Sequence, residues 1–161
     1  MTTLNKTPFN LSNPVHLLAV GFGSGLVKVA PGTFGSMAAL IIYWPLTYLS
    51  QLAFILVVLI ASILGIYICG KTATDCGVHD HGSIVFDEFV GLWIALLLMP
   101  TNLIDILGIF LLFRFFDIIK PFPIGWLDKK ISGGLGIMLD DILAGVLTLI
   151  LYFVVKFFIL A

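Results

Sequence analysis

The strongest constraint on the fold is a run of 42 residues without a charged side chain, from Val29 to Gly70. A helix needs about 20 apolar residues to cross the hydrocarbon core of a bilayer, so this run is too long for one crossing. Ser50 and Gln51 form a polar break near its middle. We therefore predict two apolar helices here, over about 36–49 and about 52–70.

Further apolar segments predict a helix over about 84–99, another over about 103–119, and a last one that starts at Asp140-Asp141 and runs to the C-terminus. The segment Ser12–Lys28 is too short to cross a bilayer, and we expect a short interfacial helix there.

The composition supports a membrane protein. Hydrophobic residues make up 60% of the 161 residues and charged residues 11%, and the mean hydropathy is +1.17. A soluble domain carries about 25% charged residues. We predict a single all-α domain over residues 1–161, a multi-pass membrane bundle of about four or five hydrophobic helices. The net charge of −1 excludes the clustered basic surface that nucleic-acid binding needs.

The charged residues are concentrated in two windows. Thirteen of the seventeen lie in Lys71–Glu88 and Arg114–Asp141. If the N-terminus is cytoplasmic, five crossings bring both windows and most lysines to the cytoplasmic face, in agreement with the positive-inside rule. We therefore expect a site on that face.

Three segments carry residues suited to chemistry. The first is Gly21-Phe-Gly-Ser-Gly25, followed by Pro31-Gly-Thr-Phe-Gly-Ser36. Its glycine amides and the hydroxyls of Thr33 and Ser36 suit a phosphate, so Gly32, Thr33 and Ser36 are candidate phosphate ligands. The alternative is that these glycines allow close helix packing.

The second segment runs from His79 to Glu88. Asp87 and Glu88 precede an apolar run, where a carboxylate is costly unless it is paired or bound to a metal. The alternative is a favourable interaction with the helix dipole, with Ser83 as the helix cap. His79, Asp80 and His81 are candidates for phosphate binding and proton transfer.

The third segment holds Arg114, Asp117 and Lys120, spaced three apart along a helix, and continues to Asp140-Asp141. An ion-pair ladder with Asp117 between two cations is the simpler interpretation, with the later aspartates as helix caps.

Together these carboxylates and cations favour another interpretation. Carboxylate oxygens suit Mg²⁺, which pairs with substrate phosphate, and cations suit the remaining phosphate charge. The residues thus indicate metal-assisted phosphoryl chemistry on a lipid headgroup.

Four motifs also carry a resemblance. Residues 12–26 (SNPVHLLAVGFGSGL), 31–36 (PGTFGS), 78–89 (VHDHGSIVFDEF) and 133–142 (GGLGIMLDDI) closely resemble the phosphatidylglycerophosphatase A family, in order and over nearly the whole chain. The resemblance implies a bacterial inner-membrane, Mg²⁺-dependent phosphatase that converts phosphatidylglycerophosphate in the bilayer to phosphatidylglycerol and phosphate.

On that basis we expect the metal at Asp87, Glu88, Asp141 and Asp117. The expected catalytic residues, which stabilise charge, transfer protons or act as nucleophile or base, are Asp80, His81, Arg114, Lys120 and Asp140, and His79 joins Gly32, Thr33 and Ser36 at the phosphate.

Three alternatives remain at this point. In the first alternative, the chain is another lipid-phosphate phosphatase or a transferase. Against an acyltransferase, His81 and Asp87 miss the HxxxxD spacing by one residue. In the second, the chain is a small transporter or channel subunit, with Asp105 or Asp117 on the path. Or it is an inactive membrane scaffold.

Overall fold

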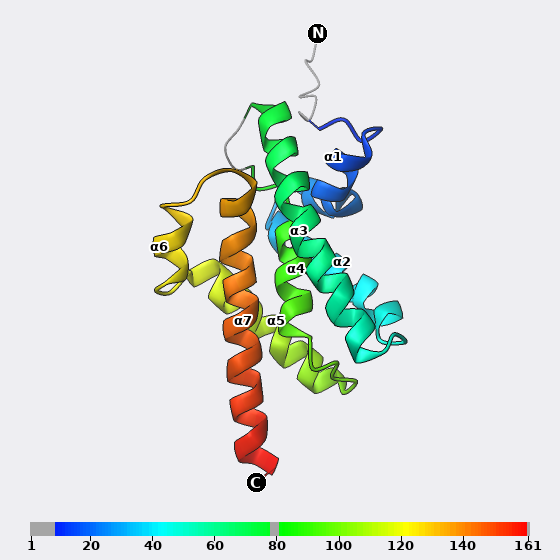
Figure 1. Ribbon diagram of the computed structural model, residues 1–161, viewed down its shortest axis with the longest axis vertical. Helices are drawn as coiled ribbons and strands as arrows, with labels where there is room; N and C mark the ends of the chain where they lie inside the picture. Colours follow the sequence, from blue (N-terminus) through cyan, green and yellow to red (C-terminus); the bar gives the residue numbers. More distant parts are fainter. Residues whose placement is uncertain (1–8, 78–80, 161) are drawn as a thin grey trace.

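The computed structural model describes residues 9–77 and 81–160 (Figure 1), and every regular element in these residues is a helix, as the sequence predicts. The elements are α1 (Pro14–Ala19), the 3₁₀-helix η1 (Gly21–Leu26), α2 (Pro31–Leu46), α3 (Gln51–Cys76), α4 (Phe86–Ala95), α5 (Leu103–Ile119), α6 (Ile124–Asp128) and α7 (Gly133–Leu160).

The short helix α4 lies at the centre of the molecule. It contacts α2, α3, α5 and α7, and its residues from Phe89 to Ala95 are all buried. The indole N–H of Trp93 donates to the carbonyl of Ala39 at 3.0 Å and so ties α4 to α2. Because α4 is enclosed by other helices, the two carboxylates in its first turn are held inside the bundle.

Glycines set how closely the helices approach. A Cβ at Gly145 of α7 would lie 2.2 Å from the carbonyl oxygen of Gly91 in α4, and a Cβ at Gly91 would lie 2.6 Å from the carbonyl oxygen of Asp141. A Cβ at Gly134 would lie 1.9 Å from the carbonyl oxygen of Ile66, at the crossing of α7 with α3. Small residues permit such backbone contact between membrane helices.

The outer surface is apolar. Within the described residues, α3 and α7 are long and apolar enough to cross a bilayer, and in Figure 1 they lie side by side and run in opposite directions. Large side chains point outward from several helices, and Ile41, Ile63 and Ile104 are each at least 70% exposed. A surface of this kind suits lipid, since soluble proteins rarely expose large contiguous apolar patches.

The helix over 103–119 was predicted to the residue, and other boundaries moved. α2 begins at Pro31 and ends at Leu46, so the glycine motif is the first turns of a helix and not a loop before it. α3 extends to Cys76, and α4 covers only Phe86–Ala95 of the predicted 84–99. The side chain of Asn13 caps the start of α1, because it accepts from the backbone N–H of Val15.

Two expectations about helix starts were wrong. The last helix begins at Gly133, so Asp140 and Asp141 lie in its third turn and are not caps. The N-cap of α4 is Val85, which makes no side-chain cap, and Ser83 lies outside the helix. The glycines of residues 133–136 predict a loop from the sequence, but this segment packs closely on α3 and forms the first turn of α7. The short helix α6 was not predicted.

The glycine contact between α4 and α7 makes a first prediction. Gly91→Ala places a methyl group against the backbone of α7 and should lower the free energy of unfolding by about 1–3 kcal/mol, as overpacking does. Thermal unfolding in detergent measures the change. Gly108→Ala in α5 is the matched control, since a Cβ there meets nothing within 4 Å and should stabilise the helix. Equal stability of the two variants would contradict the close contact between Gly91 and the backbone of α7.

Candidate metal centre

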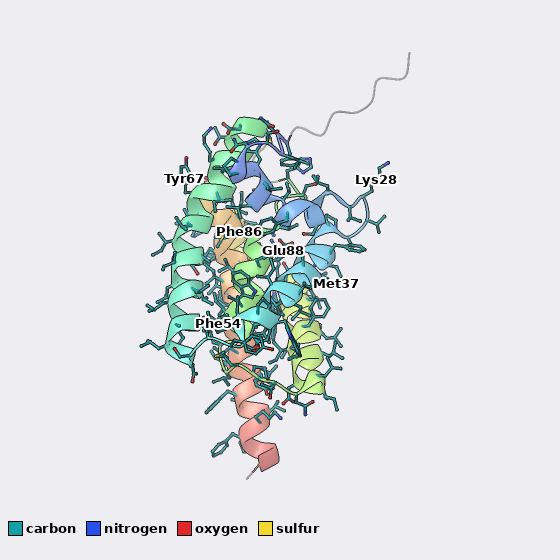
Figure 2. The ribbon with its side chains drawn as sticks, turned by 90° about the vertical axis from the view of Figure 1, so that its right-hand side faces the viewer. Lys28, Met37, Phe54, Tyr67, Phe86 and Glu88 are labelled. Atoms are coloured by element: carbon teal, nitrogen blue, oxygen red, sulfur yellow. The ribbon has the colours of Figure 1, made fainter. Side chains whose placement is uncertain are left out.

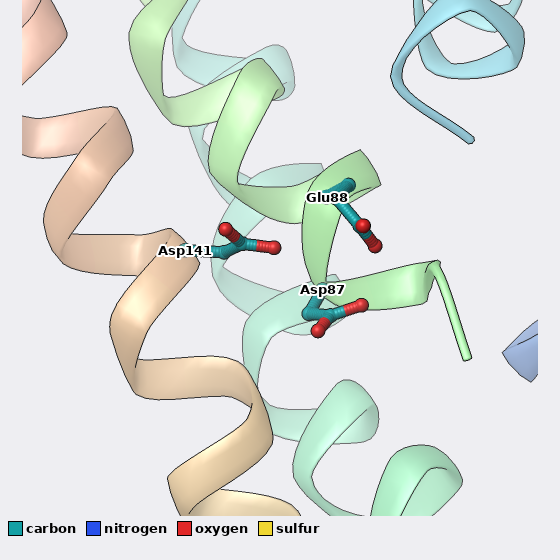
Figure 3. Close-up of side chains that lie close together, drawn as sticks. All are labelled: Asp87, Glu88 and Asp141. Atoms are coloured by element: carbon teal, nitrogen blue, oxygen red, sulfur yellow. The ribbon is translucent and has the colours of Figure 1, made fainter. Parts of the chain in front are cut away.

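Three carboxylates converge where α4 meets α7. Asp87, Glu88 and Asp141 each offer one oxygen, and these oxygens all lie within 4.8 Å of one another. Figure 3 shows Asp141 projecting from α7 toward the start of α4, where Asp87 and Glu88 follow one another. These residues lie 53 positions apart in sequence and are brought together by the glycine contact one helical turn farther along α4.

Consecutive residues on a helix point about 100° apart, so the adjacent aspartates of α7 have different surroundings. Asp141, only 2% exposed, faces the first turn of α4. Asp140 faces Lys120, whose ammonium lies 2.5 Å from its carboxylate. The acidic pair in the sequence therefore serves two separate clusters.

Arg114 of α5 connects the cluster to its neighbours. Its guanidinium lies 2.5 Å from Asp117 and 3.9 Å from Glu88. It also donates to the hydroxyl of Ser36 at 3.3 Å, and that hydroxyl donates to the carbonyl of Gly32 at 2.9 Å. One cation thus links the first turns of α2 and α4 to α5.

Gly32 leaves room for this arrangement. A Cβ at this position would lie 2.2 Å from a carboxylate oxygen of Glu88 and 3.2 Å from the Arg114 guanidinium. Gly32 and Thr33 lie in the first turn of α2, where the helix dipole is positive, so the start of α2 favours the nearby carboxylate.

The excess of negative charge among these carboxylates favours the binding of a further cation. Asp117 also interacts with Asp141, and of the clustered carboxylates Glu88 and Asp117 form ion pairs with the Arg114 guanidinium. One oxygen of Glu88 and one of Asp141 are buried without a hydrogen-bond partner among the described residues. Buried charges are tolerated when they are paired or coordinate a metal. These hard oxygen ligands, close together and incompletely bonded, fit a divalent cation such as Mg²⁺.

Lys120 belongs to the second cluster. It ends α5 in a left-handed conformation, and its ammonium lies 3.2 Å from Asp128 and 2.5 Å from Asp140. Burial lowers the pKa of Lys120, but its hydrogen bonds to these carboxylates outweigh that effect and raise the pKa above its usual value. The ladder that placed Asp117 between two cations was therefore half wrong, since Lys120 pairs elsewhere.

His81 lies in the loop before α4. Its Nδ1 accepts from the backbone N–H of Ser83 at 3.2 Å, and its ring packs edge-on against Phe9 with centroids 5.0 Å apart. With Nδ1 accepting, the proton of the neutral ring is on Nε2. His79 and Asp80, also predicted at the site, lie outside the described residues.

Sequence reasoning missed two features of the region. It did not connect Ser36 with Arg114, and it did not anticipate that His16 bonds Asp75 at 3.2 Å and so holds α1 against the end of α3. Both contacts join residues more than fifty positions apart, and no local pattern signals them. For Ser36 the available signal was a hydroxyl one turn after a glycine at a helix start.

Comparison with known proteins identifies the family of the chain. The family model described as Phosphatidylglycerophosphatase A matches residues 17–156. The chain belongs to the phosphatidylglycerophosphatase A family. The resemblance stated from the motifs is therefore confirmed, and the chain is an enzyme, a phosphatidylglycerophosphatase.

Individual relatives match over most of their length. Phosphatidylglycerophosphatase A of Escherichia coli (strain K12) is 51% identical over 151 residues, which are 92% of this chain and 88% of the relative. The protein of the same name from Haemophilus influenzae is 50% identical over 153 residues, 94% of each chain. A Bacteroides thetaiotaomicron relative, named "Putative phosphatidylinositol-3-phosphatase", is 38% identical over 150 residues, 87% of this chain and 92% of its own. No solved structure matches.

The close fit of Gly32 makes a second prediction. Gly32→Ala pushes the Glu88 carboxylate away from Arg114, and we expect kcat to fall about a hundredfold, as displacement of a catalytic group by about 1 Å does. Phosphate release by the purified variant measures this. Gly108→Ala, which meets no neighbour, should keep full activity. Near-normal activity of Gly32→Ala would contradict the role given to this contact.

Proposed function

We propose that this enzyme is a Mg²⁺-dependent phosphatase that hydrolyses the terminal phosphomonoester of phosphatidylglycerophosphate to phosphatidylglycerol and inorganic phosphate. The observation that carries the proposal is the convergence of Asp87, Glu88 and Asp141 beside Arg114. The choice of substrate rests on the relatives from E. coli and H. influenzae. Both are named for this activity, and both are about half identical to this chain over most of their length.

In this proposal Asp87, Glu88 and Asp141 hold Mg²⁺, and Asp117 supports them from α5. The metal supplies Lewis acidity toward the phosphoryl group and toward water when bound. One oxygen of Glu88 and one of Asp141 lack a hydrogen-bond partner among the described residues, and these oxygens would bind the metal.

Arg114 binds and orients the phosphoryl group. Its Nε is buried and has no hydrogen-bond partner among the described residues, so it is available to a phosphoryl oxygen. Donors held in place by their neighbours stabilise charge that develops in the transition state. Gly32, Thr33 and Ser36 at the start of α2, with His79, are the proposed further phosphate contacts.

Hydrolysis adds a water oxygen to phosphorus, breaks the bond from phosphorus to the glycerol oxygen, and returns a proton to that oxygen. We assign this proton to His81, whose Nε2 carries it in the neutral ring. Asp80 and Asp140 are the proposed alternatives for general base or covalent nucleophile. Lys120 holds Asp140 and adds positive charge beside the phosphate.

We further propose a multi-pass protein of the bacterial inner membrane with its site on the cytoplasmic face. The helices α2, α3, α4, α5 and α7 alternate in direction, so the starts of α2, α4 and α7 and the ends of α3 and α5 face the same way (Figure 1). Asp87 and Glu88 lie in the first turn of α4, and most lysines of the described residues lie in or next to these helix ends: Lys28, Lys71, Lys120, Lys129 and Lys130. The expected orientation follows the positive-inside rule.

The activity is tested with purified protein in detergent micelles and phosphatidylglycerophosphate. We expect phosphate release with Mg²⁺ and none after chelation. Phosphatidylinositol 3-phosphate, the substrate in the name of the Bacteroides relative, serves as a comparison. Absence of release from phosphatidylglycerophosphate with Mg²⁺ present would reject the proposed function.

The metal ligands are tested separately. Asp141→Asn removes one ligand, and the activity should fall more than about a hundredfold because the charge and position of the metal both change. Asp105→Asn is the matched control, since Asp105 pairs with Lys156 at 2.8 Å, away from the cluster. A variant Asp141→Asn with wild-type activity would reject the metal assignment and leave the enzyme class intact.

The orientation is tested by cysteine labelling in a cysteine-free background. Gln51 begins α3 and Lys129 directly follows α6, and both are exposed; in Figure 1 the start of α3 lies on the opposite side of the bundle from α6. An impermeant thiol reagent should label Gln51→Cys in intact cells, and Lys129→Cys only after the inner membrane is permeabilised. The reverse pattern would invert the proposed topology.

A further inference from the structure

An apolar groove lies between α2 and α5. It has a volume of about 410 Å³, within the range of about 300–1,000 Å³ that is usual for small-molecule sites. All of its lining residues come from these two helices: Leu40, Ile41, Tyr43, Trp44, Leu103, Ile106 and Leu107.

The groove has a fixed floor and an open rim. Tyr43 is 1% exposed and Ile106 is 8% exposed, so both belong to the core. The Tyr43 hydroxyl donates to the carbonyl of Pro100 at 3.3 Å, which turns its polar atom away from the groove. Trp44 and Leu103, by contrast, are each more than 60% exposed at the rim.

The groove lies along the same two helices that carry Ser36 and Arg114 beside the metal centre. On α2, Ser36, Leu40 and Tyr43 are spaced by four and three residues and share one face. On α5, Leu103, Leu107 and Arg114 are spaced by four and seven residues and also share one face. At a rise of 1.5 Å per residue, Leu107 and Leu103 lie about 10 and 16 Å along α5 from Arg114. Figure 2 shows α2 and α5 on the facing side, with Glu88 near the start of α2.

The two ends of this pair of helices differ in character. At one end Arg114 and the carboxylate cluster suit a phosphate with its metal ion, and at the other every lining residue is apolar except for the hydroxyl of Tyr43 and the indole N–H of Trp44. An amphiphile with an anionic headgroup and a hydrocarbon tail complements this arrangement.

We infer that the groove between α2 and α5 holds an acyl chain of the phosphomonoester lipid substrate while its headgroup lies at Asp87, Glu88 and Asp141. The inference rests on the proposed function and adds a second binding element to it. The enzyme recognises the tail of its substrate as well as the phosphate, and the tail fixes the direction in which the headgroup enters.

Photo-crosslinking tests the occupant directly. The probe is a phosphonate analogue of phosphatidylglycerophosphate, which cannot be hydrolysed, with a diazirine in one acyl chain. We expect labelled peptides from residues 40–44 and 103–107. Excess unlabelled phosphonate should remove this labelling, and the same excess of phosphatidylglycerol, which lacks the phosphomonoester, should not.

Three results would overturn the inference. Equal labelling of the exposed face of α3 around Leu59 and Ile63, or equal displacement by phosphatidylglycerol, would mean that the groove holds bulk lipid. If the protein instead forms a dimer that can be chemically crosslinked, and the groove of that dimer takes up no label, a second copy of the chain covers the groove. Loss of groove labelling with hydrolysis intact leaves the proposed function standing, whereas absence of hydrolysis rejects that function whatever the labelling.

A matched pair of variants gives a kinetic test. Leu107→Trp fills the groove and should lower kcat/KM for the diacyl substrate about tenfold, with hydrolysis of the deacylated headgroup unchanged. Leu59→Trp on α3 is the control, since Leu59 is 53% exposed and Leu107 48% exposed. Equal effects of both variants, or equal effects of Leu107→Trp on both substrates, would contradict the inference.

Discussion

Backbone contact between α4 and α7 is the constraint on which the site depends. Gly91 and Gly145 let the two helices approach until the carbonyl of one lies against the Cα of the other. Only at this separation can Asp141, one turn before Gly145, reach the carboxylates at the start of α4. The same contact that gives the bundle its packing therefore creates a concentration of negative charge inside it.

That charge has to be offset, because carboxylates in a low-dielectric interior repel one another and lose their hydration. Arg114 supplies one cation and is itself held by Asp117 and Ser36. The start of α2 adds its dipole, and Gly32 keeps it close. The remaining excess of negative charge accounts for the affinity for a divalent cation that we propose. In the proposed mechanism, stability and catalysis therefore depend on the same few residues.

The sequence predicted much of the fold because apolar length and charge distribution govern membrane helices. The helix over 103–119 follows from an apolar run that begins after Asn102 and stops before Pro121. The start of α7 was missed because Gly133, Gly134 and Gly136 have low helix propensity, and packing on α3 overrides it. The motif residues of the site were identified from their unusual position beside apolar segments. Their division into two clusters, with Asp141 beside Asp87 and Glu88 and Asp140 beside Lys120, follows from helix rotation and required the structure.

The central claim is that carboxylates from α4 and α7 together hold one divalent cation. Crystallography of the Mn²⁺-loaded protein, with anomalous scattering at the manganese edge, tests it most directly. We predict one anomalous peak within coordination distance of Asp87, Glu88 and Asp141, beside Arg114. A peak at the Asp128–Asp140 pair instead, or manganese bound to only one of the two helices, would contradict the account.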